Sequence, residues 1–510
     1  MKKEEKAIQD KNEGVAAEKE VNTQPTPATP SIKKNTIYNF IKTLSSVIFP
    51  LITFPYVSRV LQPENMGKYN FGNTYVNYFT LIASLGITTY AIRECSRVRD
   101  DKKKLSTVAS QIFSINIITT IIAYVLLFLI LFLYPGLNPY IRIITIQSVI
   151  IVFTTLGADW INSAMEDFKY ITLRTMAFQF ISLGLMFIFV RKPDDYVKYA
   201  AIGVFSSSGA NVVNIFYRRK FCKIRYTKHT EWRKHLKPIL LLFVMLVAQT
   251  IFSNSDITML GLMKGDYVTG LYSTSAKIYN ILNQLMASIL WVVLPRLSNY
   301  YADKNYDGIN PLLHKSLQLM AMVCLPCLFG CAVLSKEILR LVGGVNYVSA
   351  WPYLVILIGA LFFSLIGGSF LGNMIMLPSK REIIFTRACL VAAIVNIGLN
   401  FVLIPVWGAT GAALTTMLAH IILYVMMCPY MEKEIQIGSI KKIFAGPVVG
   451  GLTILMWCFL MKALFNNYLI ILLTGIVGSI VIYFVILYAM KYELLMTTLP
   501  GIKSKIFRRK

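Results

Sequence analysis

The stretch NIGLNFVLIPVWGATGAALTT, residues 396–416, lies in a strongly apolar part of the chain and decides how that part folds. Asn396 and Asn400 are four positions apart, so a helix places both amides on one face. Pro405 and Gly408 favour a tight turn that ends this helix, and the small residues after the turn allow the next helix to pack closely on a neighbour. The stretch therefore predicts two helices joined by a short turn.

The composition of the whole chain is that of a membrane protein. Of its 510 residues, 56% are hydrophobic and only 15% are charged, and the mean hydropathy is +0.59. A soluble protein usually has about 25% charged residues. The apolar residues form blocks of about 20 to 25, which is the length an α-helix needs to cross about 30 Å of hydrocarbon. The sequence therefore predicts an all-α polytopic membrane protein.

Outward from the hairpin in both directions, the apolar blocks predict about fourteen transmembrane helices. They lie at residues 36–60, 70–92, 107–133, 141–162, 169–190, 196–217, 238–263, 268–293, 312–334, 349–373, 383–404, 409–429, 441–464 and 468–490.

The charges indicate how these spans are oriented. Lys and Arg gather in the connections from even to odd spans, above all in residues 93–104 and 218–237, whereas the odd-to-even turns are poor in them. By the positive-inside rule, both termini are expected in the cytoplasm. The net charge of +26 is thus explained by topology, and nucleic-acid binding is not predicted.

Two further stretches predict no site. Residues 1–34 are rich in Lys, Glu, Pro and Thr and lack the apolar segment of a signal peptide, so a disordered cytoplasmic tail is expected. Cys324 and Cys327 have CxxC spacing, but they lie inside a predicted span without a second such pair. No metal and no other cofactor is therefore predicted.

The chain repeats itself after about 200 residues. GKYNFGNTYVNYF, residues 67–79, aligns with GLYSTSAKIYNIL, residues 270–282, with a glycine, a tyrosine and an asparagine matched at one offset. A second match pairs Arg174 with Arg387, because each follows a Leu-Gly pair at nearly the same separation. A third match relates the starts of spans six and twelve. Internal repeats of this kind indicate two structurally related halves.

Six spans in each half would give a parallel repeat with its pseudo-symmetry axis along the membrane normal. We expect an N-lobe at 35–235 and a C-lobe at 236–432 around a central cavity. Residues 433–510 carry the two extra C-terminal helices and a basic tail.

The hairpin pattern N-x-x-x-N-x-x-x-I-P-x-x-G-x-x-G-A-A resembles the eleventh and twelfth helices of the multidrug/oligosaccharidyl-lipid/polysaccharide exporter superfamily. VIFPLITFPYVSRVLQPENMGKYNFGNTY, residues 47–75, is similar to its polysaccharide branch, the Wzx-type repeat-unit flippases. LGADWINSAMEDFKYITLR, SNSDITMLG and GLYSTSAKIYN are similar to the same branch. The resemblance covers roughly residues 35–500, and the long polar N-terminal tail departs from it.

This resemblance implies two lobes around a central cationic cavity in a bacterial cell membrane. It also implies a substrate, an undecaprenyl-diphosphate-linked oligosaccharide, which would be flipped from the cytoplasmic to the outer leaflet for capsule, O-antigen or exopolysaccharide biosynthesis. Other polysaccharide-assembly proteins are possible partners.

Ionisable groups inside the spans are the candidates for binding this substrate, since each costs about 2.5–3.5 kcal/mol at membrane depth on insertion scales. A diphosphate needs fixed positive charge, which arginine and lysine supply. The candidates for the cavity are Lys277, Lys42, Arg174, Arg387, Arg59, Arg296, Asn396 and Asn400.

Several of these residues have a second explanation. Lys277 is the first choice because it lies near the middle of span eight, while a long side chain nearer an interface can reach water. Arg59 and Arg296 lie at helix ends, where interfacial anchoring is favoured. The two asparagines suit helix–helix hydrogen bonds as well as cavity lining.

Two acids are candidates for a coupling ion, Asp256 in span seven and Asp159 near the inner end of span four. For Asp256, a salt bridge to Lys277 is the favoured alternative.

Three other functions compete with this one. A cation-coupled multidrug exporter and a peptidoglycan-precursor flippase would share the fold. A membrane-embedded glycan polymerase or ligase would need a large outer loop with catalytic groups, and the longest outer loop expected here is residues 335–349. There is also no GxxxxGK[ST] phosphate loop. The sequence therefore does not predict an enzyme.

Overall fold

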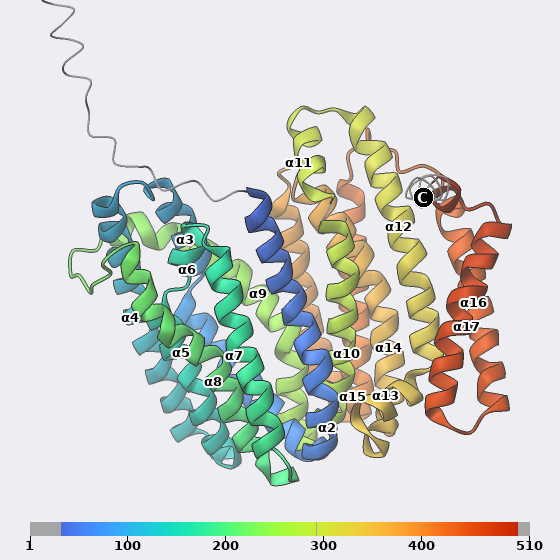
Figure 1. Cartoon of the computed structure of the whole chain (residues 1–510), viewed down its shortest axis with the longest axis horizontal. Coiled ribbons are helices and arrows are strands. Elements are labelled where there is room, and N and C mark those ends of the chain that lie inside the picture. Colours follow the sequence, from blue (N-terminus) through green and yellow to red (C-terminus); the bar gives the residue numbers. More distant parts are fainter. Residues whose placement is uncertain (1–31, 292, 498–510) are drawn as a thin grey trace, which may run out of the picture.

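The structure is a computed structural model that describes residues 32–291 and 293–497. This part of the chain folds into helices joined by short connections, without strands (Figure 1). The predicted all-α class is thereby confirmed. Most of the tail predicted at 1–34, and the basic C-terminal residues after Thr497, lie outside the described residues.

The helices have the following bounds: α2 (Ile32–Ser84), α3 (Ile87–Arg97), α4 (Lys102–Leu133), α5 (Ile141–Gly157), α6 (Trp160–Ala164), α7 (Phe168–Phe189), α8 (Tyr196–Tyr217), α9 (Trp232–Lys264), α10 (Asp266–Trp291), α11 (Leu294–Ala302), α12 (Tyr306–Val333), α13 (Ser335–Gly343), the 3₁₀-helix η4 (Val345–Ala350), α14 (Trp351–Phe363), the π-helix η5 (Ser364–Met376), α15 (Glu382–Met427), α16 (Ile440–Leu464) and α17 (Tyr468–Ala489).

Ten helical segments of the described chain are long and apolar enough to cross a membrane, and the bent pair α10–α11 raises the number to eleven. Two of these segments contain a sharp break, α2 at Gln62 with φ 62° and α15 at Gly408 with φ 56°. The second break confirms the turn predicted from Pro405 and Gly408. Helix α8 matches the predicted sixth span and has 22 residues, but it is not among the ten because serines and other polar residues dilute its apolar content.

The connection between α12 and α14 is not an open loop. Residues 335–349, expected as the longest outer loop, form α13 and most of η4. Leu339 and Tyr347 are fully buried there, and Glu337 pairs with Lys462 of α16 at 2.9 Å. The prediction of a loop was wrong because this segment is amphipathic and packs its apolar side on the neighbouring helices.

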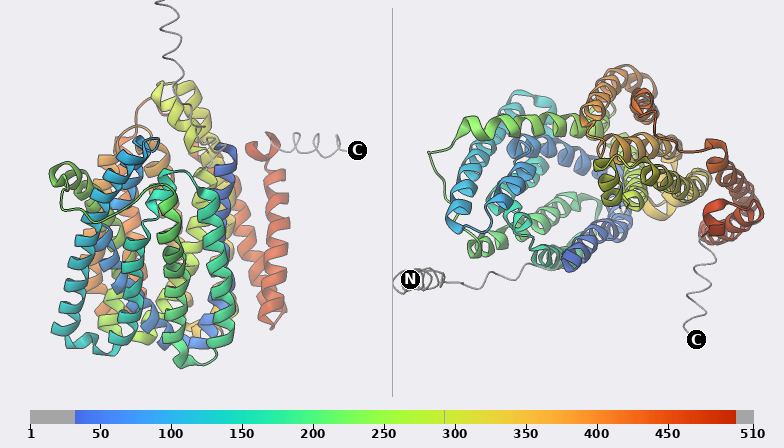
Figure 2. Two further views of the ribbon diagram at one scale, coloured as in Figure 1. Left: turned by 60° about the vertical axis from the view of Figure 1, so that its left-hand side comes forward. Right: turned by 90° about the horizontal axis from the view of Figure 1, so that it is seen from above.

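Helices α2–α8 form one group and α10–α15 a second, and α16 and α17 lie at the far side of the second group beside α12 (Figures 1 and 2). Helix α9 contacts both groups: His235 Nδ1 lies 2.8 Å from Tyr90 Oη of α3, and Ser255 donates to Asn396 of α15 at 2.9 Å. The connections α3–α4, α8–α9 and α11–α12 lie at one end of the molecule, the upper end in Figure 1, which we call the basic end. The break in α2 and helix α13 lie at the opposite end.

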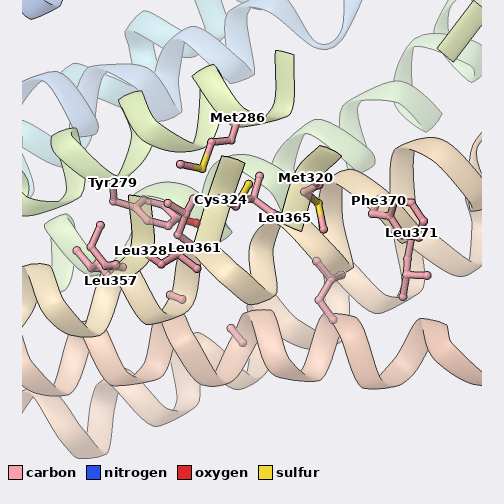
Figure 3. Close-up of a cluster of buried hydrophobic side chains, with 14 of the residues drawn as sticks. Tyr279, Met286, Met320, Cys324, Leu328, Leu357, Leu361, Leu365, Phe370 and Leu371 are labelled. Carbon is pink, nitrogen blue, oxygen red and sulfur yellow. The ribbon is translucent and has the colours of Figure 1, made fainter. Parts of the chain in front are cut away.

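An extensive apolar core holds the second group together (Figure 3). Tyr279 and Met286 of α10 pack there with Met320 and Cys324 of α12 and with Leu361 of α14. Cys324 thus lies among apolar side chains, as a small hydrophobic residue does. This core fixes α10 against its own group and leaves another face of α10 to contact α2.

Candidate functional site

Helices α2 and α10 cross at two glycines that the sequence repeat relates. A Cβ atom on Gly67 would lie 1.9 Å from the carbonyl oxygen of Asp266, and one on Gly270 would lie 1.8 Å from that of Pro63. Gly67 and Gly270 are 203 positions apart, and so are Pro63 and Asp266. The same contact is therefore made twice, once from each half of the repeat. Only glycine allows two backbones to approach so closely.

Further hydrogen bonds join the two groups at this end, which is opposite to the basic end. Asn70 of α2 donates to Ser273 of α10 at 2.8 Å, and these residues are again 203 positions apart. Ser58 donates to the carbonyl oxygen of Val342 in α13 at 2.8 Å. The two groups are thus held together at the end opposite to the basic end.

Between this crossing and the basic end, α2 and α10 each carry a stripe of exposed polar side chains. These are Asn73 and Asn77 on α2, and Lys277, Asn280 and Gln284 on α10. A spacing of three or four residues places each set on one helix face. Lys277 forms no ion pair and no hydrogen bond with the described residues, so its ammonium group is available to a ligand.

The ion pair favoured for Asp256 and Lys277 is not formed. Asp256 is 5% exposed, and its Oδ2 accepts hydrogen bonds from Tyr272 Oη and Thr416 Oγ1, each at 2.5 Å. Its Oδ1 accepts one from Asn400 Nδ2 at 2.6 Å. The prediction was wrong because neutral donors surround the carboxylate, while Lys277 lies on the exposed face of α10.

The two asparagines of the hairpin link helices. Asn396 Oδ1 accepts hydrogen bonds from Ser255 Oγ at 2.9 Å and from Asn400 Nδ2 at 3.3 Å. Asn400 Oδ1 accepts one from Thr415 Oγ1 at 2.5 Å. Asn396 Nδ2 is buried and has no partner among the described residues. The pair therefore ties α9 to both halves of α15, and Asn400 also contacts Asp256.

A cavity of about 450 Å³ lies beside Asp256. Most of its lining comes from α9, α10 and α15, and it includes Asp256, Tyr272, Tyr279, Thr416 and His420. His420 Nε2 is 2.9 Å from Tyr279 Oη. Carboxylate and hydroxyl oxygens suit hard cations, and a buried carboxylate can also take up a proton. The cavity therefore contains groups of the kind that hold a cation or take up a proton.

Sequence reasoning did not find Tyr272, Thr416 or His420 as members of this site. One signal was present, because Thr416 and His420 are four positions apart in the second half of the hairpin. That helix face points to Asp256 only after α15 folds back on itself at Gly408.

Arg174 and Asp159 lie together, away from Asp256. Arg174 Nη2 is 2.6 Å from Asp159 Oδ1, and Arg174 is 7% exposed. Both residues line a second cavity, of about 400 Å³, between α2, α7 and α8. Asp159 thus has a basic partner, whereas Asp256 has none among the described residues.

The remaining basic candidates lie apart from one another. Lys42 is half-buried in the first part of α2. Arg59 is exposed near the break in α2 and donates to the carbonyl oxygen of Leu341 in α13. This hydrogen bond joins the two helix groups at the end opposite to the basic end. Arg296 is exposed in the first turn of α11.

Arg387 lies on an exposed apolar face of α15. It shares this face with Ile383 and Ile394, which are 64% and 68% exposed, whereas Cys389 on another face lines the cavity beside Asp256. The structure thus brings Asp256, Asn396 and Asn400 together. It does not bring Lys277, Arg174 and Arg387 into one cavity among the described residues.

The fold is that of a helical protein with many segments able to cross a membrane. The structure is similar to one described as "Lipid II flippase MurJ, inward closed conformation", with a TM-score of 0.71 and 17% identity over 89% of this chain and 99% of that chain.

Residues 32–301 match the family described as "Polysaccharide biosynthesis protein". This match covers more than half of the chain, and the chain belongs to that family. The family predicted from the residues is thereby confirmed.

Named relatives are more distant. The "Putative O-antigen transporter" of Escherichia coli (strain K12) is 24% identical over 79% of this chain and 97% of its own length. The "Capsular polysaccharide biosynthesis protein CapF" of Staphylococcus aureus is 24% identical over 76% of this chain and 96% of its own length.

Proposed function

We propose that this chain is a flippase that carries undecaprenyl-diphosphate-linked oligosaccharide repeat units from the cytoplasmic to the outer leaflet of a bacterial cell membrane. Membership of a polysaccharide biosynthesis family and the similarity to an O-antigen transporter support this role. The observation that carries the proposal is Lys277, a cation on the exposed polar stripe of α10 that has no partner among the described residues. An ammonium group there suits the diphosphate of the carrier lipid, since charge-assisted bonds to phosphate are strong.

The proposed topology has fourteen spans with both termini in the cytoplasm, so that the basic end is the cytoplasmic end. The breaks at Gln62 and Gly408 and the inclusion of α8 support this count. The lobes would comprise residues 35–235 and 236–432, and α16 and α17 would form the C-terminal addition.

Transport would proceed by alternating access of the two lobes. The crossing of α2 and α10 would then be the closed outer end, and the polar stripes between the crossing and the basic end would face the cytoplasm. Separation of the two glycine contacts would open the path to the outer leaflet, while the lipid tail of the substrate stays in the bilayer.

Asp256 is proposed to couple this cycle to a cation gradient. In Asp256→Asn, stimulation of transport by an imposed proton or sodium gradient should disappear, because the amide has no negative charge to hold a cation and cannot take up a proton. The measurement is transport in proteoliposomes with each gradient applied separately.

Asp159→Asn is the matched control for Asp256→Asn, because Asp159 already has Arg174 as its partner. This control should keep the gradient dependence of the unaltered protein. Undiminished stimulation in Asp256→Asn would exclude Asp256 as the coupling group.

Deletion of the gene tests the function itself. Complete repeat units linked to undecaprenyl diphosphate should accumulate in the deletion strain, while the surface glycan is lost, and the mass of the accumulated lipid identifies the cargo. An intact surface glycan without accumulation would contradict the proposal and favour a drug exporter, which drug sensitivity of the same strain would then reveal.

A further inference from the structure

The cavity that contains Arg174 belongs to the first helix group alone. Its lining comes from α2, α7, α8 and the connection between α5 and α6, and most of the lining side chains are polar. These helices are proposed to cross the membrane, where a polar group without a partner costs several kcal/mol. The polar side chains in its lining therefore favour a polar occupant.

Arg174 is held in one orientation, with part of its hydrogen-bonding capacity unused. Its Nη2 bonds to Asp159, and its guanidinium lies 5.1 Å from the ring centroid of Tyr170, which stacks on Tyr217 at 3.5 Å. Its Nε and Nη1 are buried and have no partner among the described residues. Buried donors without a partner are rare in proteins and call for an acceptor.

Other side chains of α7 present further donors to the same cavity. Thr175, Gln179 and Ser182 are spaced by four and three residues, so they share one helix face, and all three line the cavity. Gln179 Oε1 already accepts a bond from Ser45 at 2.7 Å, so the amide NH₂ of Gln179 remains to donate. Ser182 is 4% exposed and its hydroxyl has no partner among the described residues.

These donors and a permanently charged guanidinium match an oxyanion. A phosphate group offers several acceptor oxygens and negative charge, and arginine binds it through two parallel bonds. Asp159 occupies Nη2, and its side chain is 38% exposed, so an incoming oxyanion can compete with Asp159 for the guanidinium.

We infer that this cavity is a phosphate-binding site, separate from the stripe that carries Lys277. The phosphate can come from the diphosphate of the carrier lipid, an assignment that rests on the proposed function, or from a free inorganic anion. The site itself does not depend on that choice.

The test uses the full chain in lipid nanodiscs and inorganic pyrophosphate as the probe, with binding measured by calorimetry. Arg174→Gln should weaken binding at least about tenfold, the scale of a lost charge-assisted bond. Asp159→Asn should tighten it several-fold, because the competing carboxylate is removed. A purely structural ion pair would predict no such opposite effects.

Arg387→Gln is the matched control, since Arg387 occupies the repeat-related position on an exposed apolar face. It should bind pyrophosphate like the unaltered protein. Gln179→Leu removes one donor and keeps the ion pair, so it tests the site if Arg174→Gln does not fold, and it should also weaken binding.

Undecaprenyl diphosphate distinguishes the two sources. Competition between this lipid and pyrophosphate identifies the carrier lipid as the ligand, and binding of pyrophosphate without competition identifies a free anion. Equal binding to Arg174→Gln and the unaltered protein, or no binding to either, would overturn the inference. Failure of the proposed function would appear separately, as the absence of accumulated lipid in the deletion strain.

Discussion

Lys277→Ala should lower transport by about one to two orders of magnitude, because it removes a charge-assisted bond worth about 1.5–3 kcal/mol to a phosphate group. The side chain is exposed and contacts no charged partner among the described residues, so its loss should leave folding and membrane insertion unchanged. Surface glycan in a complemented deletion strain measures the effect, with the amount of protein in the membrane determined in parallel.

Two matched variants separate charge from shape at this position. Lys277→Arg keeps the positive charge and should retain most of the transport. Arg387→Ala removes a cation from the exposed apolar face of α15 and should have little effect. Normal export by a well-expressed Lys277→Ala protein would remove Lys277 from the substrate path.

Gly270→Ala should abolish transport although it adds only one methyl group. The new Cβ would lie 1.8 Å from the carbonyl oxygen of Pro63, so α2 and α10 could not approach as they do now. Gly67→Ala should have the same effect, since its Cβ would lie 1.9 Å from the carbonyl oxygen of Asp266. The double variant should be no worse than either single one, because both break one crossing.

Cross-linking measures the crossing directly. Asn70→Cys and Ser273→Cys replace two residues that now share a hydrogen bond of 2.8 Å, and this pair should form a disulfide readily. Gly270→Ala should strongly reduce its yield. Gly398→Ala is the control, because no atom lies within 4 Å of a Cβ at Gly398. An unchanged cross-link together with normal transport would show that the crossing tolerates a methyl group.

The sequence predicted much of the fold because membrane helices depend on the apolar character of long blocks, which can be read locally. The hairpin at 396–416 is an example, since its break falls at Gly408 as the turn residues indicate. At 335–349 the sequence predicted a loop, and the helices α13 and η4 found there were not predicted. The burial of Leu339 and Tyr347 depends on neighbours distant in the sequence.

The candidate site was predicted less completely for the same reason. Asp256 and Lys277 were expected to pair because opposite charges inside a membrane usually do. Their relative position depends on which faces of α9 and α10 meet, and the periodicity of a nearly uniformly apolar helix does not reveal that. Likewise, the repeat relates Arg174 to Arg387 by position, but only Arg174 faces a cavity.

The duplicated glycine contact also has the symmetry of an interface between two identical subunits. In a two-fold homodimer the same pair of residues meets twice, once from each subunit, and such an interface is called isologous. The crossing of α2 and α10 has this form within one polypeptide. This two-fold form holds at the crossing and is lost beyond it, since the exposed Lys277 of α10 corresponds to the buried Thr74 of α2, 203 positions earlier.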